Sequence, residues 1–239
     1  MTENKFNIKD TILAVDINEA TQAVKENRFK DAINLLEISL TDHPDHIDSL
    51  YLAGVCSRYL KKFDDAIKYI ESLLLHAPDM GRAYQELAHI NRDMGNEEKS
   101  ISNYRQACEL NPALISSWMS LYEYFKQNNN KPALDHATEQ INKLKSLPNM
   151  LLYIDQVMNE GRLGVAELKC REFLKKNPTH TYAMSQLSEI ANRLGHFDDA
   201  ELLLEKAVQF NPDDGELRMK YALVLRKKQK FAKTMEQVN

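Results

Sequence analysis

Basic side chains at regular intervals are the feature of this sequence with the clearest chemistry. Lysine or arginine returns at multiples of about 34 residues, at Lys25, Arg58, Arg92, Lys126, Arg193 and Arg226. A guanidinium holds a carboxylate through two parallel hydrogen bonds, so a row of such groups favours an acidic guest. The alternative interpretation is that these residues lie at helix ends, where a positive charge complements the helix dipole.

Residues suited to catalysis or metal binding are sparse. His43 and His46 stand beside Asp42 and Asp45 in the segment TDHPDH, which could offer metal ligands, but no cysteine accompanies them. The sequence has no G-x-x-x-x-G-K-[ST] loop, no G-x-G-x-x-G turn and no G-x-S-x-G elbow. We therefore predict that this chain is not an enzyme and that it holds no metal and no cofactor.

Composition narrows the classes of partner. The 239 residues carry a net charge of -4, which gives no general attraction to nucleic acid or to anionic membranes. The polar start MTENKFNIKD is unlike a secretory signal, and apolar runs such as Leu73–Leu75 are too short to cross a bilayer. Three cysteines, Cys56, Cys108 and Cys170, are predicted to be reduced, buried thiols of a cytoplasmic protein.

Proline spacing indicates how the chain is organised. Pro44, Pro78 and Pro112 lie 34 residues apart, and so do Pro178 and Pro212. The gap of 66 between Pro112 and Pro178 is two residues short of two further steps. A fixed period in this range is typical of stacked helical repeats, which bind partners on an extended surface.

Other residue types recur in the same register. With each proline at position 32, small residues fall at position 20, namely Ala32, Ala66, Ser100, Ala166 and Ala200. Bulkier residues follow four places later, at Leu36, Ile70, Tyr104, Cys170 and Leu204. Glycines mark a turn at Gly95, Gly161 and Gly195. The small residues let two helices approach closely, and proline favours the end of the second helix.

These residues resemble the tetratricopeptide repeat, whose pattern is W-x2-L-G-x2-Y, then A-x3-F, then P. The resemblance implies an all-α, right-handed superhelical solenoid of antiparallel helix pairs, with about six and a half repeats in a single domain over 1–239. The repeats would span about 13–46, 47–80, 81–114, an irregular 115–146, 147–180, 181–214 and a partial 215–239. Repeat five has a truncated first helix that begins near Asn149.

The chain stops within its seventh unit. A last helix, about Phe231 to Val238, would either cap the array or belong to a longer protein that continues beyond it.

The resemblance also implies where a partner binds, because the first helices of such repeats line a concave groove. The predicted groove residues are Tyr51, Arg58, Tyr59, His89, Arg92, Lys126, Tyr182, Arg193 and Arg226. The same register places Leu151, Asp155 and Met158 there, and Trp118 in the core. One subclass grips chaperone tails with a Lys/Asn/Arg clamp, but here Ile17, Thr21, Tyr51 and Val55 occupy the clamp's Lys and Asn positions.

Three functions follow as hypotheses. The first is a protein-interaction scaffold that binds a protein or peptide, favourably an acidic one, in the groove. The second rests on a narrower likeness: the C-terminal half, with SEIANRLGHFDDAE, is similar to the repeat region of bacterial sulfotransferases, which implies a docking arm of a larger enzyme. The third is self-assembly through the unfinished seventh unit, and the oligomeric state, including a monomer, stays open.

Overall fold

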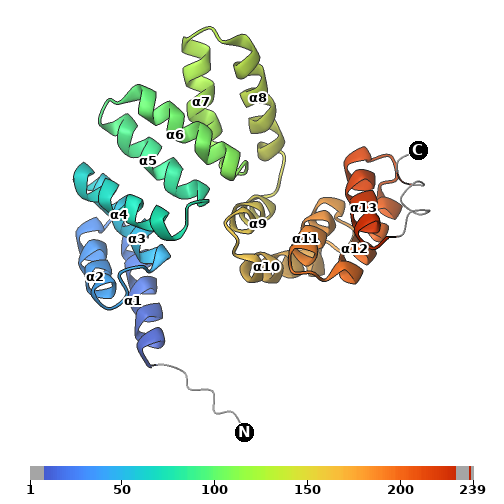
Figure 1. Cartoon of the computed structure of the whole chain (residues 1–239), viewed down its shortest axis with the longest axis horizontal. Coiled ribbons are helices and arrows are strands. Elements are labelled where there is room, and N and C mark those ends of the chain that lie inside the picture. The colour runs from blue at the N-terminus through green and yellow to red at the C-terminus, as the bar shows by residue number, and fades with distance from the viewer. Residues whose placement is uncertain (1–7, 230–236, 238–239) are drawn as a thin grey trace. The chain divides into compact units, whose positions relative to one another are not determined.

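The computed structural model describes residues 8–229 and residue 237, with side chains placed from Ile17 onward. Between residues 8 and 229 the chain forms thirteen α-helices and no strand (Figure 1). The helices are α1 (Ile8–Lys25), α2 (Phe29–Asp42), α3 (Ile47–Tyr59), α4 (Phe63–His76), α5 (Gly81–Asp93), α6 (Glu97–Leu110), α7 (Ile115–Gln127), α8 (Lys131–Lys145), α9 (Asn149–Asn159), α10 (Leu163–Lys176), α11 (Thr181–Arg193), α12 (Phe197–Phe210) and α13 (Gly215–Lys227).

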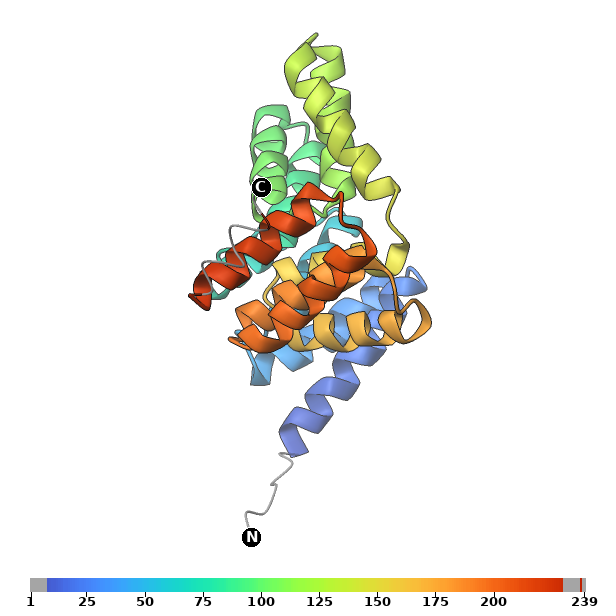
Figure 2. The same ribbon diagram turned by 90° about the vertical axis from the view of Figure 1, so that its right-hand side faces the viewer.

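Successive helices form hairpins, which confirms the predicted all-α fold of antiparallel pairs. The helices α1 to α12 make six pairs, and α13 begins a seventh. We call the first helix of each pair the A helix and the second the B helix. Within a pair the two helices lie side by side, as α5 and α6 do in two perpendicular views (Figures 1 and 2).

The chain divides into two compact units, an N-terminal unit of residues 1–141 and a C-terminal unit of residues 142–239. The division falls in the B helix of the irregular fourth repeat. Of the predicted last helix, only Gln237 is among the described residues. No helix in the described part of the chain is long and apolar enough to cross a membrane.

In the turn that follows each A helix, one residue has a left-handed backbone conformation. Three of these residues are glycines, Gly95, Gly161 and Gly195, with φ values of 80, 75 and 81°. The others are Asn27, Lys61, Asn129 and Gln229, with φ between 52 and 60°. Glycine takes this conformation without the steric cost that a Cβ atom brings, which explains its place in the sequence pattern.

These turns locate the irregularity in the repeat. They follow one another at intervals of 34 residues except for 32 between Asn129 and Gly161. Helix α9 lies in that interval and has 11 residues, whereas α7 and α11 each have 13. The predicted truncation of the first helix of repeat five is therefore confirmed. At the other end, α1 begins at Ile8, earlier than residue 13.

The core follows the small and large positions of the pattern. Ala66 is fully buried, and at Gly54 an added Cβ would lie 2.5 Å from Ile70 Cδ1, so α3 and α4 pack closely there. Ser100, the polar member of the small set, is buried and donates a hydrogen bond to the Ala88 carbonyl at 3.0 Å. All three cysteines are buried and free, as predicted. Burial raises the pKa of the Cys56 thiol to about 11, which makes it unreactive.

Candidate functional site

The A helices of each unit form one side-chain surface, which we call the A-helix face of that unit. In the N-terminal unit, Gln85 of α5 donates hydrogen bonds to Ser116 Oγ at 2.7 Å and to Ser117 Oγ at 2.8 Å on α7. In the C-terminal unit, Lys220 of α13 donates to Ser185 Oγ of α11 at 3.1 Å. Successive A helices are thus linked by polar side chains, and the face is continuous within a unit.

The six regularly spaced basic residues all lie in the last turn of an A helix. This place satisfies the helix-dipole interpretation for every one of them. Whether a residue can also meet a partner depends on what surrounds its charged end, and the surroundings differ sharply along the chain.

Arg58 lies in a buried ion-pair network. Its Nε donates to Glu86 Oε1 at 2.5 Å, and its Nη1 donates to Asp93 Oδ2 at 3.3 Å. Only 11% of the Arg58 side chain and 4% of the Glu86 side chain are exposed. Burial raises the pKa of Glu86, and the bond from Arg58 opposes this rise. Arg58 therefore stabilises the contact between α3 and α5, and a charge reversal at Arg58 would disturb folding as well as binding.

His89 and Arg92 share the hydroxyl of Tyr104. The Tyr104 oxygen lies 2.7 Å from His89 Nδ1 and accepts a hydrogen bond from Arg92 Nη1 at 3.2 Å. Burial, together with the nearby charges of Arg58 and Arg92, lowers the pKa of His89 to about 4. His89 is thus a neutral residue at physiological pH. Arg92 is half-exposed and also contacts Asp93 at 3.3 Å.

The remaining predicted groove residues of the N-terminal unit are more accessible. The guanidinium of Arg82 lies 4.8 Å from the ring centre of Tyr51. Tyr59 is exposed over about half of its surface (54%) and stacks on Phe29 with ring centres 4.4 Å apart. Lys126 is exposed.

The C-terminal unit holds a buried carboxylate with neutral partners. Asp155 of α9 accepts a hydrogen bond from the Tyr182 hydroxyl at 2.6 Å and another from Gln186 Nε2. Burial raises the pKa of Asp155, and these two hydrogen bonds oppose the rise. The assignment of Leu151 and Met158 to the groove was wrong, because both are buried in the core. Both pack in one apolar cluster with Cys170 of α10 and Leu187 of α11.

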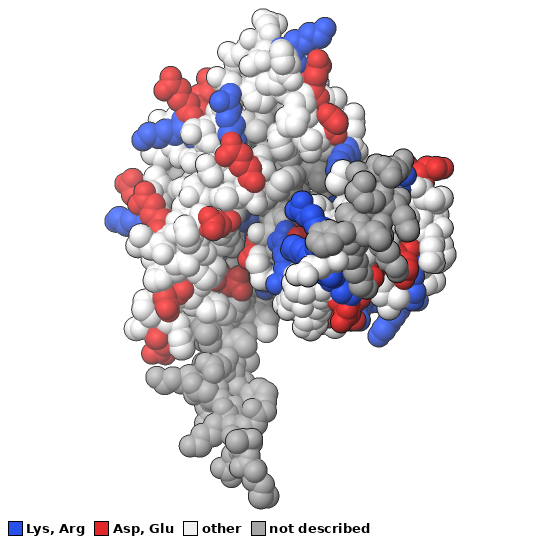
Figure 3. All heavy atoms as spheres, turned by 45° about the vertical axis from the view of Figure 1, so that its right-hand side comes forward, with Lys and Arg blue, Asp and Glu red and all other residues white. Residues whose placement is uncertain are grey.

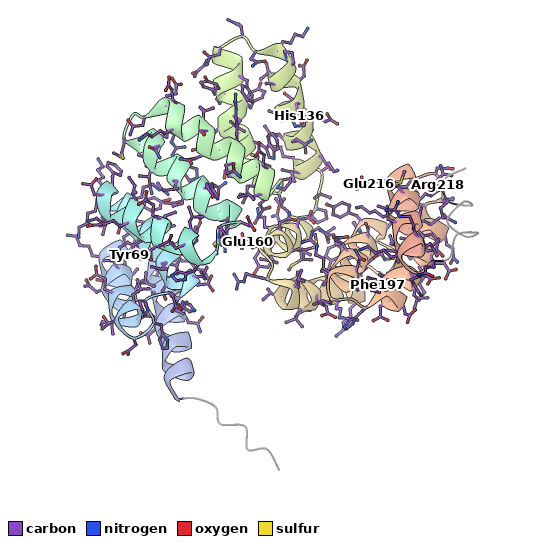
Figure 4. All side chains as sticks on the ribbon, viewed as in Figure 1. Tyr69, His136, Glu160, Phe197, Glu216 and Arg218 are labelled. Atoms are coloured by element: carbon purple, nitrogen blue, oxygen red, sulfur yellow. The ribbon has the colours of Figure 1, made fainter. Side chains whose placement is uncertain are left out.

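Three basic residues of α13 and the carboxylate of Glu189 on α11 line a cleft of about 150 Å³ between α11 and α13. Lys227 donates a hydrogen bond to Asn192 Oδ1 at 3.0 Å. Lys220 contacts Glu216 at 2.9 Å; Glu216 and Arg218 are labelled on α13 in Figure 4. Arg226 lines the cleft, is exposed and has no ion pair among the described side chains. Arg193 is bonded to Glu189 at 2.8 Å and to the Met158 carbonyl at 3.2 Å.

The two units differ in charge. The N-terminal unit contains 22 acidic and 15 basic residues, a net charge of -7, and the C-terminal unit contains 13 and 16, a net charge of +3. Figure 3 shows Lys and Arg side chains gathered on the C-terminal unit, whereas the visible face of the N-terminal unit carries more Asp and Glu. A row of equivalent basic residues in the sequence is thus divided between an acidic and a basic unit.

The structure assigns roles to residues that the sequence pattern left out. Glu86 and Asp93 pair with Arg58 across 28 and 35 residues, and the second separation is close to one repeat. Lys220 and Lys227 stand 35 residues after Ser185 and Asn192. A search for opposite or complementary side chains at about one repeat length would have found these pairs. His46, a candidate metal ligand, instead caps α3, accepting a hydrogen bond from the Ser49 amide at 3.2 Å.

Known families match this chain through its repeats. One sequence profile described as tetratricopeptide repeat matches residues 23–90, and a second with the same description matches residues 81–114 and 182–214. These matches together cover just over half of the chain. They agree with the helix pairs that the structure shows.

Two curated proteins are similar to the chain over long stretches. The DnaJ homolog subfamily C member 7 homolog of Dictyostelium discoideum is 22% identical over 236 residues, which are 95% of this chain and 39% of that protein. Pre-mRNA-splicing factor 6 of Saccharomyces cerevisiae is 29% identical over 127 residues, 52% of this chain and 14% of that protein. The chain spans less than half the length of either relative.

A solved structure, that of Naa15/Naa10 bound to HypK-THB, is 17% identical to the chain. The likeness covers 93% of this chain and 35% of that one, with a TM-score of 0.50. At this level of identity the likeness concerns the fold alone.

Proposed function

We propose that this chain, which is built from tetratricopeptide repeats, is a cytoplasmic scaffold that binds an acidic segment of a partner protein on the A-helix face of its C-terminal unit. The chain performs no catalysis in this role. The observation that carries the proposal is Arg226, an exposed guanidinium beside the cleft between α11 and α13 with no ion pair among the described residues. An acidic side chain would supply the missing partner.

Exposed apolar side chains on the same helix as Arg226 support a peptide as the guest. Met219 is 52% exposed and Leu223 is 44% exposed, and both project from α13. Leu223 lines the same cleft as Lys227. A segment with carboxylates beside one or two apolar residues would meet charge and apolar area together. Binding would then depend on a few anchors rather than on the whole surface.

Selection from a random peptide library on the immobilised chain tests this function. We expect acidic peptides to be enriched on the wild type and lost on the variant Arg226→Glu/Lys227→Glu. The matched control is Lys175→Glu/Lys176→Glu, which makes the same charge change at the exposed end of α10 in the same unit. Enrichment of peptides without acidic residues, or equal loss on both variants, would contradict the proposal.

The other two hypotheses remain predictions with tests of their own. If the same gene also encodes a phosphosulfate-binding loop, the hypothesis that this chain is the docking arm of a sulfotransferase would be supported. A molar mass that rises with concentration in light scattering would establish self-assembly, whereas a constant monomer mass would eliminate it.

A further inference from the structure

A cleft of about 560 Å³ lies among α6, α7 and α8 of the N-terminal unit. Each helix contributes residues from one stripe, and the floor is formed by Trp118, Leu121 and Phe125 of α7. Cys108 of α6 and Ala133 of α8 complete the apolar lining. The volume and the apolar, aromatic lining are those of a small-molecule site. This cleft lies in a different unit from the site proposed above and does not depend on it.

A partly buried polar side chain of α8, Gln140, lines this cleft. Seven residues after the small position, the B helices α2, α4, α6 and α12 carry a buried residue: Ser39, Leu73, Ala107 and Ala207. Counting in the same way from Ala133, α8 carries Gln140, which is only partly buried and lines the cleft. At the same position α10 carries Phe173, which is also partly buried, so the distinguishing feature of Gln140 is its polar side chain.

Trp118 belongs partly to this cleft and only partly to the core in which it was predicted. Its ring packs beside Leu121 and Phe125, and its Nε1 donates to the Pro112 carbonyl at 2.9 Å. The planes of the Trp118 and His136 rings are nearly perpendicular, with centres 5.4 Å apart; Figure 4 labels His136 on α8. A flat aromatic face next to an opening is suited to stacking with a planar guest.

Charge at the rim specifies the guest further. The guanidinium of Arg105 lies 5.5 Å from the ring centre of Phe125, so a cation stands over the aromatic wall of the cleft. Arg105 is exposed and forms no ion pair with any described residue. His136 and Gln140 on the opposite wall offer further N–H donors, and Glu109 is the one carboxylate in the lining. We propose that this cleft binds a planar, apolar small molecule that carries a single anionic group, which Arg105 pairs with.

A pair of fluorescent probes tests this proposal. Anilinonaphthalene sulfonate has a planar aromatic body and one anion, and its parent phenylnaphthylamine has the same body without charge. Trp118 is the only tryptophan of the chain, so energy transfer from tryptophan to the probe reports binding near this cleft. We expect saturable transfer to the sulfonate, with affinity about fivefold higher than for the uncharged probe.

Two variants distinguish the contact between Arg105 and the anion from non-specific binding of the probe. Arg105→Gln should lower affinity for the sulfonate about fivefold and leave the uncharged probe unchanged. Lys99→Gln removes the same charge from an exposed position on α6 outside the cleft, and it should change neither affinity. Absence of saturable transfer from Trp118 would overturn the proposal. Equal affinity for the two probes, or an unchanged sulfonate affinity in Arg105→Gln, would also overturn it.

Discussion

Each unit buries one carboxylate on its A helices, and the two carboxylates are stabilised in opposite ways. Glu86 of the N-terminal unit is held by the guanidinium of Arg58. Asp155 of the C-terminal unit is held by the neutral side chains of Tyr182 and Gln186. In the first unit a basic residue is used inside the fold. In the second unit no described cation bonds to Asp155, whereas Lys228 bonds to the buried Glu201 of α12, and the basic residues of α13 line an open cleft.

This contrast shows that position in the repeat does not decide what a basic residue does. Arg58 and Arg226 both lie in the last turn of an A helix. Arg58 meets Glu86 and Asp93 on the following A helix, whereas Arg226 shares its cleft with Glu189, which bonds to Arg193, and forms no ion pair with any described residue. The surroundings of each arginine, rather than its register, therefore decide whether its charged end is paired within the fold.

Removing Arg58 should produce the largest effect. Arg58→Met leaves Glu86 buried without a counter-charge, so we expect a loss of about 3–5 kcal/mol in the free energy of unfolding, measured in urea. Arg226→Met, the matched change in the other unit, should alter it by less than about 0.5 kcal/mol. Equal stability of the two variants would contradict the claim that Arg58 stabilises the fold whereas Arg226 does not. The double variant Arg58→Met/Glu86→Leu should recover most of the stability.

Acid should affect the N-terminal unit through His89. Its folded-state pKa of about 4 lies below the ordinary value of 6.5, because burial and the charges of Arg58 and Arg92 disfavour the imidazolium. The unfolded chain therefore binds more protons between these values, and stability is lost as pH falls from about 6.5 toward 4. Relative to His89→Asn, we expect the wild type to lose on the order of 1–2 kcal/mol between pH 7 and 5. Parallel pH profiles of the two proteins would show that His89 is not buried as a neutral group.

The smallest effect concerns Asp155. Burial raises its folded-state pKa, so the wild type should gain stability as pH falls through that pKa, and Asp155→Asn should lack this gain. At pH 7 Asp155→Asn should lie within about 1 kcal/mol of the wild type, because its partners are neutral. Glu86→Gln, the corresponding change in the other unit, should cost about 3 kcal/mol. Equal losses in thermal or urea unfolding would mean that the two buried acids are alike after all.

Much of the fold could be predicted from the sequence, because the residues that build a helix hairpin recur in phase. The prolines, the small residues such as Ala66 and the turn glycines such as Gly95 follow directly from local steric rules. The two-residue deficit between Pro112 and Pro178 predicted an irregularity in this stretch, and α9 is shortened there.

The candidate site could be predicted only in part. Register alone suggested that Leu151 and Met158 face outward, but both are buried in an apolar cluster formed with α10 and α11. Register also made Arg58 and Arg226 look equivalent. It could not show that Arg58 pairs with Glu86, because Glu86 belongs to the neighbouring repeat. The cleft beside Trp118 was missed for a similar reason, since it depends on how three helices pack around Gln140.

The most direct test of the account measures the affinity of the chain for a fluorescein-labelled decaglutamate peptide by anisotropy at low ionic strength. If the basic residues beside the α11–α13 cleft bind the partner, Arg226→Glu/Lys227→Glu should weaken binding at least about tenfold. The control Lys175→Glu/Lys176→Glu should weaken it less than about threefold. Equal weakening by both variants, or undiminished binding to Arg226→Glu/Lys227→Glu, would contradict the account.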